Sequence, residues 1–184
     1  ARCARSSAAC ASSWPAASGA VAGRATIEGK PVIYTRLRST YMHELDSARG
    51  FSDFNDPGKM GNAREFQRAA SKIGYTFNWL YADDRDIAYF NSGDNPQRAK
   101  GTTGQLPMAA KYEGRGWDPD RFTAAYTSFA KHPQVINRQR YLTSWNNKQA
   151  PGFAGADSNL YSSVYRSQML DSEIEPRIAG ARRL

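Results

Sequence analysis

The sequence predicts a mixed α+β fold, in which strand pairs and helices occupy separate stretches of the chain. Two segments, residues 25–36 and 75–90, have the apolar and turn pattern of β-hairpins. Between them lies a segment with the pattern of an amphipathic helix, and a second helix is expected near the end of the chain. A chain of 184 residues is long enough to build a hydrophobic core around such elements.

The first 24 residues are predicted to be a low-complexity tail that precedes a folded domain over residues 25–184. They are mainly Ala, Ser, Gly and Arg, with no acidic residue and no apolar periodicity. Both cysteines, Cys3 and Cys10, lie in this tail, so a thiol nucleophile in the folded part is excluded. The first hairpin then has strands at 25–27 and 31–35 around a Gly29 turn.

The helix between the hairpins has a start and a stop signal. Asn62 followed by Glu65 forms a capping-box pattern, and Gly74 marks the end. The apolar positions at helical spacing are Phe66, Ala69, Ala70 and Ile73. In the second hairpin, aromatic residues alternate along 75–81, and the charged residues 83–86, three of them Asp, are expected to form a solvated turn.

Frequent Gly and Pro after Phe90 predict a loop-dominated half with short regular elements. Residues 139–148 are expected to form a strand. The final helix is expected over residues 165–178, with a break at Pro176.

Charge and hydropathy limit the classes of partner. The mean hydropathy is −0.68, and no run of about 18 apolar residues occurs, which excludes a membrane-spanning helix in this sequence. The net charge of +8 is spread among acids without a block of like charges, so neither nucleic acid nor a membrane is expected as a partner. A basic nucleic-acid-binding module remains the alternative hypothesis, motivated by that charge and the Arg and aromatic content.

Common catalytic motifs are missing from the sequence. Ser47 stands where a zinc-binding motif starting at His43 would need its second histidine, and no GxSxG motif occurs. With His43 and His132 as the only histidines, a Ser-His-Asp triad has no support, and both are expected to be polar surface or turn residues.

Several short motifs occur in a fixed order along residues 25–184. They are Trp79-Leu80-Tyr81-Ala82-Asp83, Asp86-Ile87-Ala88-Tyr89-Phe90, Asn91-Ser92-Gly93, Pro96-Gln97-Arg98, Gly116-Trp117 and Ser144-Trp145-Asn146-Asn147-Lys148. In these motifs the chain resembles an internal fragment of the beta subunit of the penicillin acylase (penicillin amidase) family of N-terminal-nucleophile hydrolases. The resemblance implies part of an αββα sandwich, incomplete in this chain. It also implies hydrolysis of linear amides, of penicillin or acyl-homoserine-lactone type, by a Ser whose own α-amino group is the base.

The resemblance also assigns roles to individual residues. Asn146 matches the residue whose side-chain N–H binds the tetrahedral oxyanion, and Arg166 matches an arginine that orients the substrate and the active-site network. Phe77 and Phe54 fall where the acyl pocket is lined, and Asp157 matches a calcium ligand of some members. Without the family context, Asn146 would be interpreted as a turn residue, Arg166 as a surface residue and the phenylalanines as core.

The chain is expected to depart from the family at its beginning, because Ala1 is not a nucleophile and residues 1–24 show no resemblance to the family's motifs. The attacking Ser is therefore expected on an upstream segment, and this chain alone is expected to be inactive. Its expected partners are an acyl-amide substrate and the remaining acylase segments or alpha subunit. No cofactor is expected for the chemistry, although the resemblance suggests a structural calcium ion, and it implies a secreted or periplasmic location. An inactive acylase remnant is the other alternative.

Overall fold

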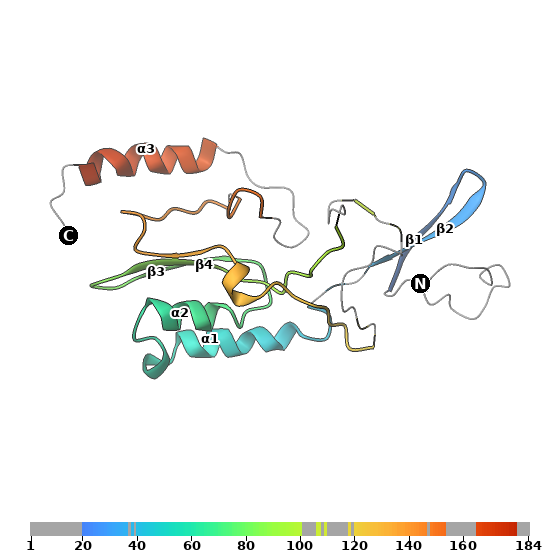
Figure 1. Ribbon diagram of the computed structural model, residues 1–184, viewed down its shortest axis with the longest axis horizontal. Coiled ribbons are helices and arrows are strands. Elements are labelled where there is room, and N and C mark those ends of the chain that lie inside the picture. Colours follow the sequence, from blue (N-terminus) through green and yellow to red (C-terminus); the bar gives the residue numbers. More distant parts are fainter. Residues whose placement is uncertain are drawn as a thin grey trace. The chain divides into compact units, whose positions relative to one another are not determined.

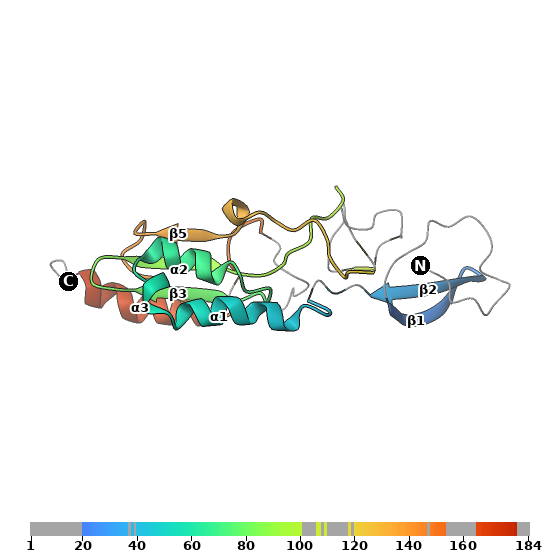
Figure 2. The ribbon, with the colours of Figure 1, turned by 90° about the horizontal axis from the view of Figure 1, so that it is seen from below.

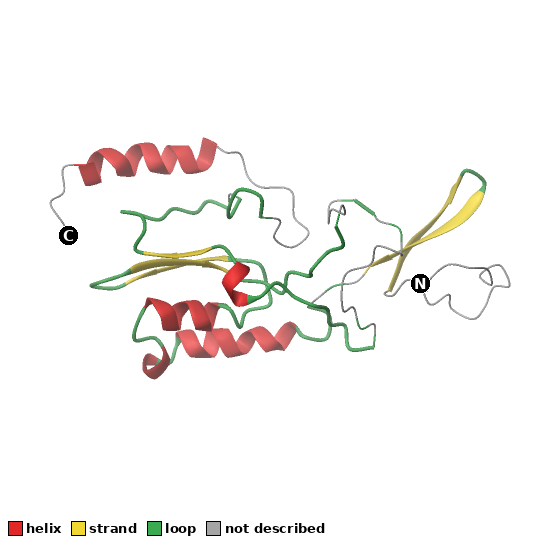
Figure 3. Cartoon of the chain, viewed as in Figure 1, coloured by secondary structure: helices red, strands yellow, loops and turns green. Residues whose placement is uncertain are grey.

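The computed structural model describes residues 20–36, 38, 40–100, 106–107, 109, 118, 120–146, 148–153 and 165–179. These residues form two compact units. The first contains the described residues up to Leu45 together with those of Asp94–Thr127, and the second contains Asp46–Gly93 and the described residues from Ser128 onward. Helices and strands occupy separate stretches, which confirms the mixed α+β class (Figure 3). No helix in the described part of the chain is long and apolar enough to cross a membrane.

The first unit contains the predicted hairpin. Strand β1 (Ala20–Ile27) pairs antiparallel with β2 (Lys30–Arg36), and Ile27 lies opposite Lys30. The two turn residues, Glu28 and Gly29, have positive φ angles of 49° and 74°, the conformation that a tight two-residue hairpin requires. β1 begins inside the segment predicted to be a tail, because pairing with β2 extends the strand into residues of low strand propensity.

Elsewhere in the first unit, regular structure is short, as the Gly and Pro spacing predicted. Two isolated bridges, Pro96 with Tyr126 and Asp118 with Thr123, are the described pairings outside the hairpin. His43 lies beside a turn, and its Nε2 atom is 2.8 Å from the Arg121 carbonyl oxygen.

The second unit is a three-stranded antiparallel sheet covered by helices. The sheet has the order β3 (Asn78–Ala82), β4 (Ile87–Asn91), β5 (Gln134–Ile136). Helices α1 (Ala48–Phe54) and α2 (Ala63–Ala70) cover one face, while residues 137–146 and α3 (Tyr165–Ala179) lie on the other side (Figures 1 and 2). Short 3-10 turns occur at Glu44–Ser47, Pro57–Lys59 and Phe129–Lys131.

The hydrophobic core lies between α2 and the sheet. Its buried members are Ala63, Phe66, Ala70, Ala88 and Phe90, and Phe54, Met60, Trp79, Tyr81 and Ile136 pack around them. Gln67 joins the same layers, because its amide nitrogen donates to the carbonyl oxygens of Tyr89 (3.1 Å) and Val135 (3.3 Å). The core therefore holds α2, the helix that the sequence predicted, against β4, the central strand of the sheet.

Helix α2 begins at the predicted cap. The Asn62 side chain accepts hydrogen bonds from the backbone N–H groups of Arg64 (3.0 Å) and Glu65 (3.1 Å). The Glu65 carboxylate returns to the N–H of Gly61 at 2.8 Å, one residue before the position that a standard capping box would use. Helical structure ends at Ala70, so the apolar Ile73 lies just beyond the helix.

Helix α1 is not predicted by the sequence pattern, because Gly50, Ser52 and Asp53 are poor helix formers. Packing against α2 stabilises it instead: a Cβ atom on Gly50 would lie 2.5 Å from Ile73 Cγ1 and 2.7 Å from the Ala69 carbonyl oxygen. The two helices approach so closely that only glycine fits at position 50.

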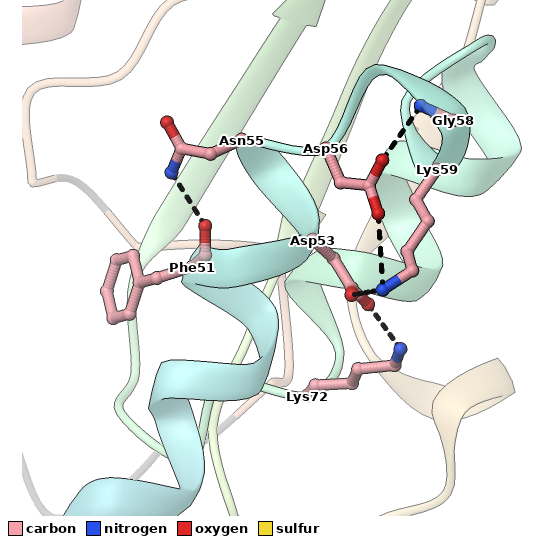
Figure 4. Close-up of polar contacts among 7 residues, drawn as sticks. All are labelled: Phe51, Asp53, Asn55, Asp56, Gly58, Lys59 and Lys72. Carbon is pink, nitrogen blue, oxygen red and sulfur yellow. Dashed lines mark hydrogen bonds and ion pairs between the residues drawn. The ribbon is translucent and has the colours of Figure 1, made fainter.

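An ion cluster fixes the C-terminal end of α1 (Figure 4). The Asp53 carboxylate, which is 9% exposed, accepts from the ammonium group of Lys59 at 2.9 Å and from that of Lys72. Lys59 also contacts Asp56 at 3.4 Å. The cluster thus joins α1 to the turn before α2 through Lys59, and to the residues after α2 through Lys72.

The β3–β4 hairpin has the predicted acidic turn. Asp83 Oδ1 accepts from the backbone N–H groups of Arg85 (2.7 Å) and Asp86 (2.6 Å). Asp83, Asp84 and Arg85 are exposed, so this turn is a solvated connection.

Two expectations for the C-terminal half are wrong. The strand of this region is β5 at Gln134–Ile136, and the described residues of 139–148 form no strand. Asn137 stops the pairing, because it has a φ of 53° and its side chain accepts from the N–H of Ile87 at 2.8 Å. Helix α3 continues past Pro176 to Ala179, so the expected break does not occur. Pro176 lies in the last turn, where few helical residues follow it.

Candidate active site

Asn146 lies in an irregular segment beside the sheet of the second unit. Its side chain is exposed and its φ angle is 54°. Asn adopts this left-handed conformation more readily than most other residues, and such conformations are frequent at functional positions. Two residues earlier, the half-buried Ser144 accepts a hydrogen bond from the Asn78 side chain at 3.0 Å, which ties the segment to β3.

A hollow of about 610 Å³ lies behind this segment. It is lined by Asn78, Tyr89, Pro133, Gln134, Val135, Gln139, Tyr141, Leu142, Thr143, Ser144, Lys148, Gln149, Ala150 and Asp171. Ser144 and Lys148, on either side of Asn146, are both among these residues. The hollow is therefore bounded by the sheet, the segment around Asn146 and helix α3.

A polar network occupies the end of the sheet next to the hollow. The Asn78 oxygen accepts from the Tyr89 hydroxyl (2.7 Å) and from the side-chain nitrogen of Asn91 (3.1 Å). Burial raises the pKa of the Tyr89 hydroxyl well above its usual range, so this group is a neutral donor. Ser92 is fully buried, and its hydroxyl accepts from Trp79 Nε1 at 2.9 Å.

An aromatic row runs beside this network. The Phe77 ring is 50% exposed and stands edge-on to Trp79, with ring centroids 5.7 Å apart. Phe54 contacts the same Trp79 ring at 5.1 Å and stacks on Phe66 at 5.8 Å. Phe77 therefore has an open face, whereas Phe54 is part of the packing of the helices on the sheet.

A family model described as penicillin amidase matches residues 16–183 of the chain. The chain belongs to the penicillin amidase family. It is 31% identical over 130 residues to penicillin G acylase of Escherichia coli, an alignment that covers 66% of this chain and 14% of that protein.

The structure also resembles a penicillin amidase relative of known structure. It matches a thermostable penicillin G acylase from Alcaligenes faecalis with a TM-score of 0.61 and 27% identity. The match covers 86% of this chain and 30% of the other. This likeness confirms the expected fold, so β3, β4 and β5 with their covering helices are part of an N-terminal-nucleophile hydrolase fold. The chain thus spans less than a third of the length of each of these relatives.

The structure does not bring Asn146, Phe77 and Phe54 together at the hollow, because none of the three is among its lining residues. Asn146, Phe77 and Phe54 all lie in the second unit. Arg166 lies in the first turn of α3, and its side chain is outside the described part, as is the whole of Asp157. Among the described residues, no three acidic, histidine or cysteine side chains are close enough together to hold a metal ion.

The expectation for the histidines is correct for one of them. His43 lies at a turn, whereas His132 is buried, with 8% exposure. Its Nδ1 atom lies 2.8 Å from the Asn91 carbonyl oxygen, and its ring stacks on Phe90 at 5.5 Å. A position between an aromatic core residue and a buried carbonyl explains why this polar residue is inside.

The polar network is the part of the candidate site that sequence reasoning missed. Asn78 occupies one of the positions that alternate with the aromatic residues of 75–81, and Asn91 and Ser92 precede Gly93, a pattern that is typical of an ordinary turn. The available signal is that asparagine is a poor strand former, which sets Asn78 apart from its neighbours in the predicted strand. Its partner Ser144 is 66 residues away, and no local pattern indicates that contact.

Proposed function

We propose that this chain is one segment of an amidase that hydrolyses linear amides of penicillin or acyl-homoserine-lactone type. The attacking Ser, with its free α-amino group as base, is supplied by a segment outside these 184 residues. Asn146 supplies the oxyanion donor, and the chain alone is inactive. The observation that carries the proposal is the penicillin amidase match over residues 16–183.

The chemistry of Asn146 supports its role. A carboxamide is a neutral donor that needs no proton transfer when negative charge develops on a carbonyl oxygen. Loss of one such donor typically costs roughly 2.7 to 4 kcal/mol of transition-state stabilisation. The exposed side chain of Asn146 and its φ of 54° are suited to a group that faces a ligand rather than the core of its own segment.

The aromatic row supports an apolar acyl group as the part of the substrate that is recognised. The open face of Phe77 would contact the acyl group directly, since sites that bind apolar groups are generally lined by apolar and aromatic side chains. Phe54 would act mainly through Trp79, whose ring both phenylalanines contact.

Other roles follow from the family alone. We propose Arg166 as the residue that orients the substrate, and Asp157 as a ligand of a structural calcium ion whose remaining ligands come from other segments. A secreted or periplasmic location, and association with the other acylase segments or an alpha subunit, belong to the same proposal.

The test uses the complete enzyme, meaning this chain together with the segments that carry the attacking Ser. It should release 4-nitroaniline from an arylacetyl 4-nitroanilide, and Phe77→Ala should raise KM for this substrate more than for the acetyl analogue. The matched control is Phe129→Ala, which removes an aromatic ring that is 43% exposed and contacts another ring of this unit, that of Phe90 at 5.3 Å. Failure of the complete enzyme to hydrolyse any acyl anilide would reject the proposed activity.

A further inference from the structure

Asn78 connects the two parts of the chain to which the proposed function assigns roles. It follows Phe77 in the sequence, and its side-chain nitrogen donates to the Ser144 hydroxyl at 3.0 Å. Ser144 precedes Asn146 by two residues. We infer that Asn78 is a positioning residue that holds the Asn146 carboxamide through Ser144, an inference that rests on the proposed function.

The surrounding contacts determine the orientation of the Asn78 side chain. The side-chain nitrogen of the fully buried Asn91 lies 3.0 Å from the Phe77 carbonyl oxygen, and that oxygen can only accept. The same nitrogen lies 3.1 Å from Asn78 Oδ1. The oxygen of Asn78 therefore faces Asn91, and its nitrogen must face Ser144.

A second donor strengthens this orientation. The Tyr89 hydroxyl lies 2.7 Å from Asn78 Oδ1, and as a phenol it is protonated at neutral pH and can donate to that oxygen. Asn78 thus accepts two hydrogen bonds from one strand of the sheet and donates one to the segment that carries Asn146. A half-buried amide that makes three side-chain hydrogen bonds is held in one orientation, which is what a support for a catalytic group requires.

Asn146 needs such support, because it lies outside any helix or strand and is exposed. No backbone ladder fixes its φ of 54°. An oxyanion donor contributes fully only when it is already in place before charge develops on the substrate. The hydrogen bond to Ser144 is the anchor that the described structure provides two residues before Asn146.

The test measures kcat and KM of the complete enzyme for the acyl anilide. Asn78→Ala and Ser144→Ala should each lower kcat about three- to tenfold, the range expected for one hydrogen bond, with KM changed less than twofold. Ser144→Thr retains the hydroxyl and should keep kcat within twofold of the parent. Asn55→Ala and Ser71→Ala remove surface groups that bond only to nearby carbonyl oxygens, and they serve as matched controls.

The same changes are then made in an Asn146→Ala enzyme. A residue that acts through Asn146 has no further effect there, so Asn78→Ala and Ser144→Ala should leave the reduced kcat unchanged. Losses that persist in full in this background would overturn the inference and leave the proposed function intact. If Asn146→Ala alone leaves kcat unchanged, the proposed function itself fails.

Thermal unfolding accompanies each variant. If Asn78→Ala does not fold, the Ser144→Ala and Ser144→Thr pair decides, because both retain the Asn78, Tyr89 and Asn91 contacts. Equal kcat values for these two serine variants and the parent would contradict the inference.

Discussion

Asp53 makes an electrostatic contact whose strength depends on pH. Hydrogen bonds from the ammonium groups of Lys72 and Lys59 lower the pKa of its carboxyl group below the ordinary value of 3.8 (Figure 4). Since the folded-state pKa is the lower one, the contribution to stability is complete above pH 3.8 and is lost as the pH falls through the lowered value.

We therefore predict that protection of the α1 amides against hydrogen exchange decreases in acid and that Asp53→Asn removes this decrease. The measurement is amide exchange in the complete enzyme between pH 6 and 3, corrected for intrinsic rates. Asp84→Asn is the control, because Asp84 is 85% exposed and contacts only Arg85 at 3.5 Å. Equal acid sensitivity of the parent and Asp53→Asn would contradict the prediction.

Single residues of the candidate site were predictable only through the order of motifs. Asn146 is predictable because Ser144-Trp145-Asn146 is one of the ordered motifs that resemble the family. By itself, an Asn in a polar segment has no periodicity that would indicate a role. Asn78 was not found, because its role depends on a contact with Ser144 across 66 residues of chain.

Helices and strands were predictable where their signals are local. The cap at Asn62, the Gly29 turn and the acidic turn at Asp83 each satisfy backbone groups within a few residues, and all three occur as expected. Helix α1 was missed because its stability depends on contact with α2. Residues 139–148 were misassigned because strand formation requires a neighbouring strand, and β4 pairs with β5 instead.

Contact between α1 and α2 predicts the effect of a change at Gly50. Alanine is the better helix former, but its Cβ atom would lie 2.5 Å from Ile73 Cγ1, so Gly50→Ala should destabilise the protein by about 1–3 kcal/mol. Gly23→Ala is the matched control, because no atom lies within 4 Å of its added Cβ. Thermal unfolding measures both, and an equal or higher melting temperature for Gly50→Ala would contradict the close packing.

At the scale of the whole molecule, the described residues leave large apolar side chains uncovered. Leu45, Met42, Leu106 and Met169 are 86%, 72%, 67% and 63% exposed. Exposed apolar faces follow from the expectation of an incomplete sandwich, but which side chains are exposed depends on what packs against each element.

The chain expressed alone should therefore bind a hydrophobic dye and self-associate, as exposed apolar surface tends to do. The complete enzyme should do so much less. Dye fluorescence and sedimentation of the two samples at equal concentration provide the measurement. Low dye binding and a monomeric state of the chain alone would show that it needs no covering segments.

The role of Asn146 is the central claim, and kcat of the complete enzyme for an acyl anilide tests it most directly. Asn146→Ala should lower kcat by about 10²–10³-fold with KM nearly unchanged, because the donor acts mainly in the transition state. The neighbouring Trp145→Phe should retain most of the activity. A kcat for Asn146→Ala within twofold of the parent would contradict the account.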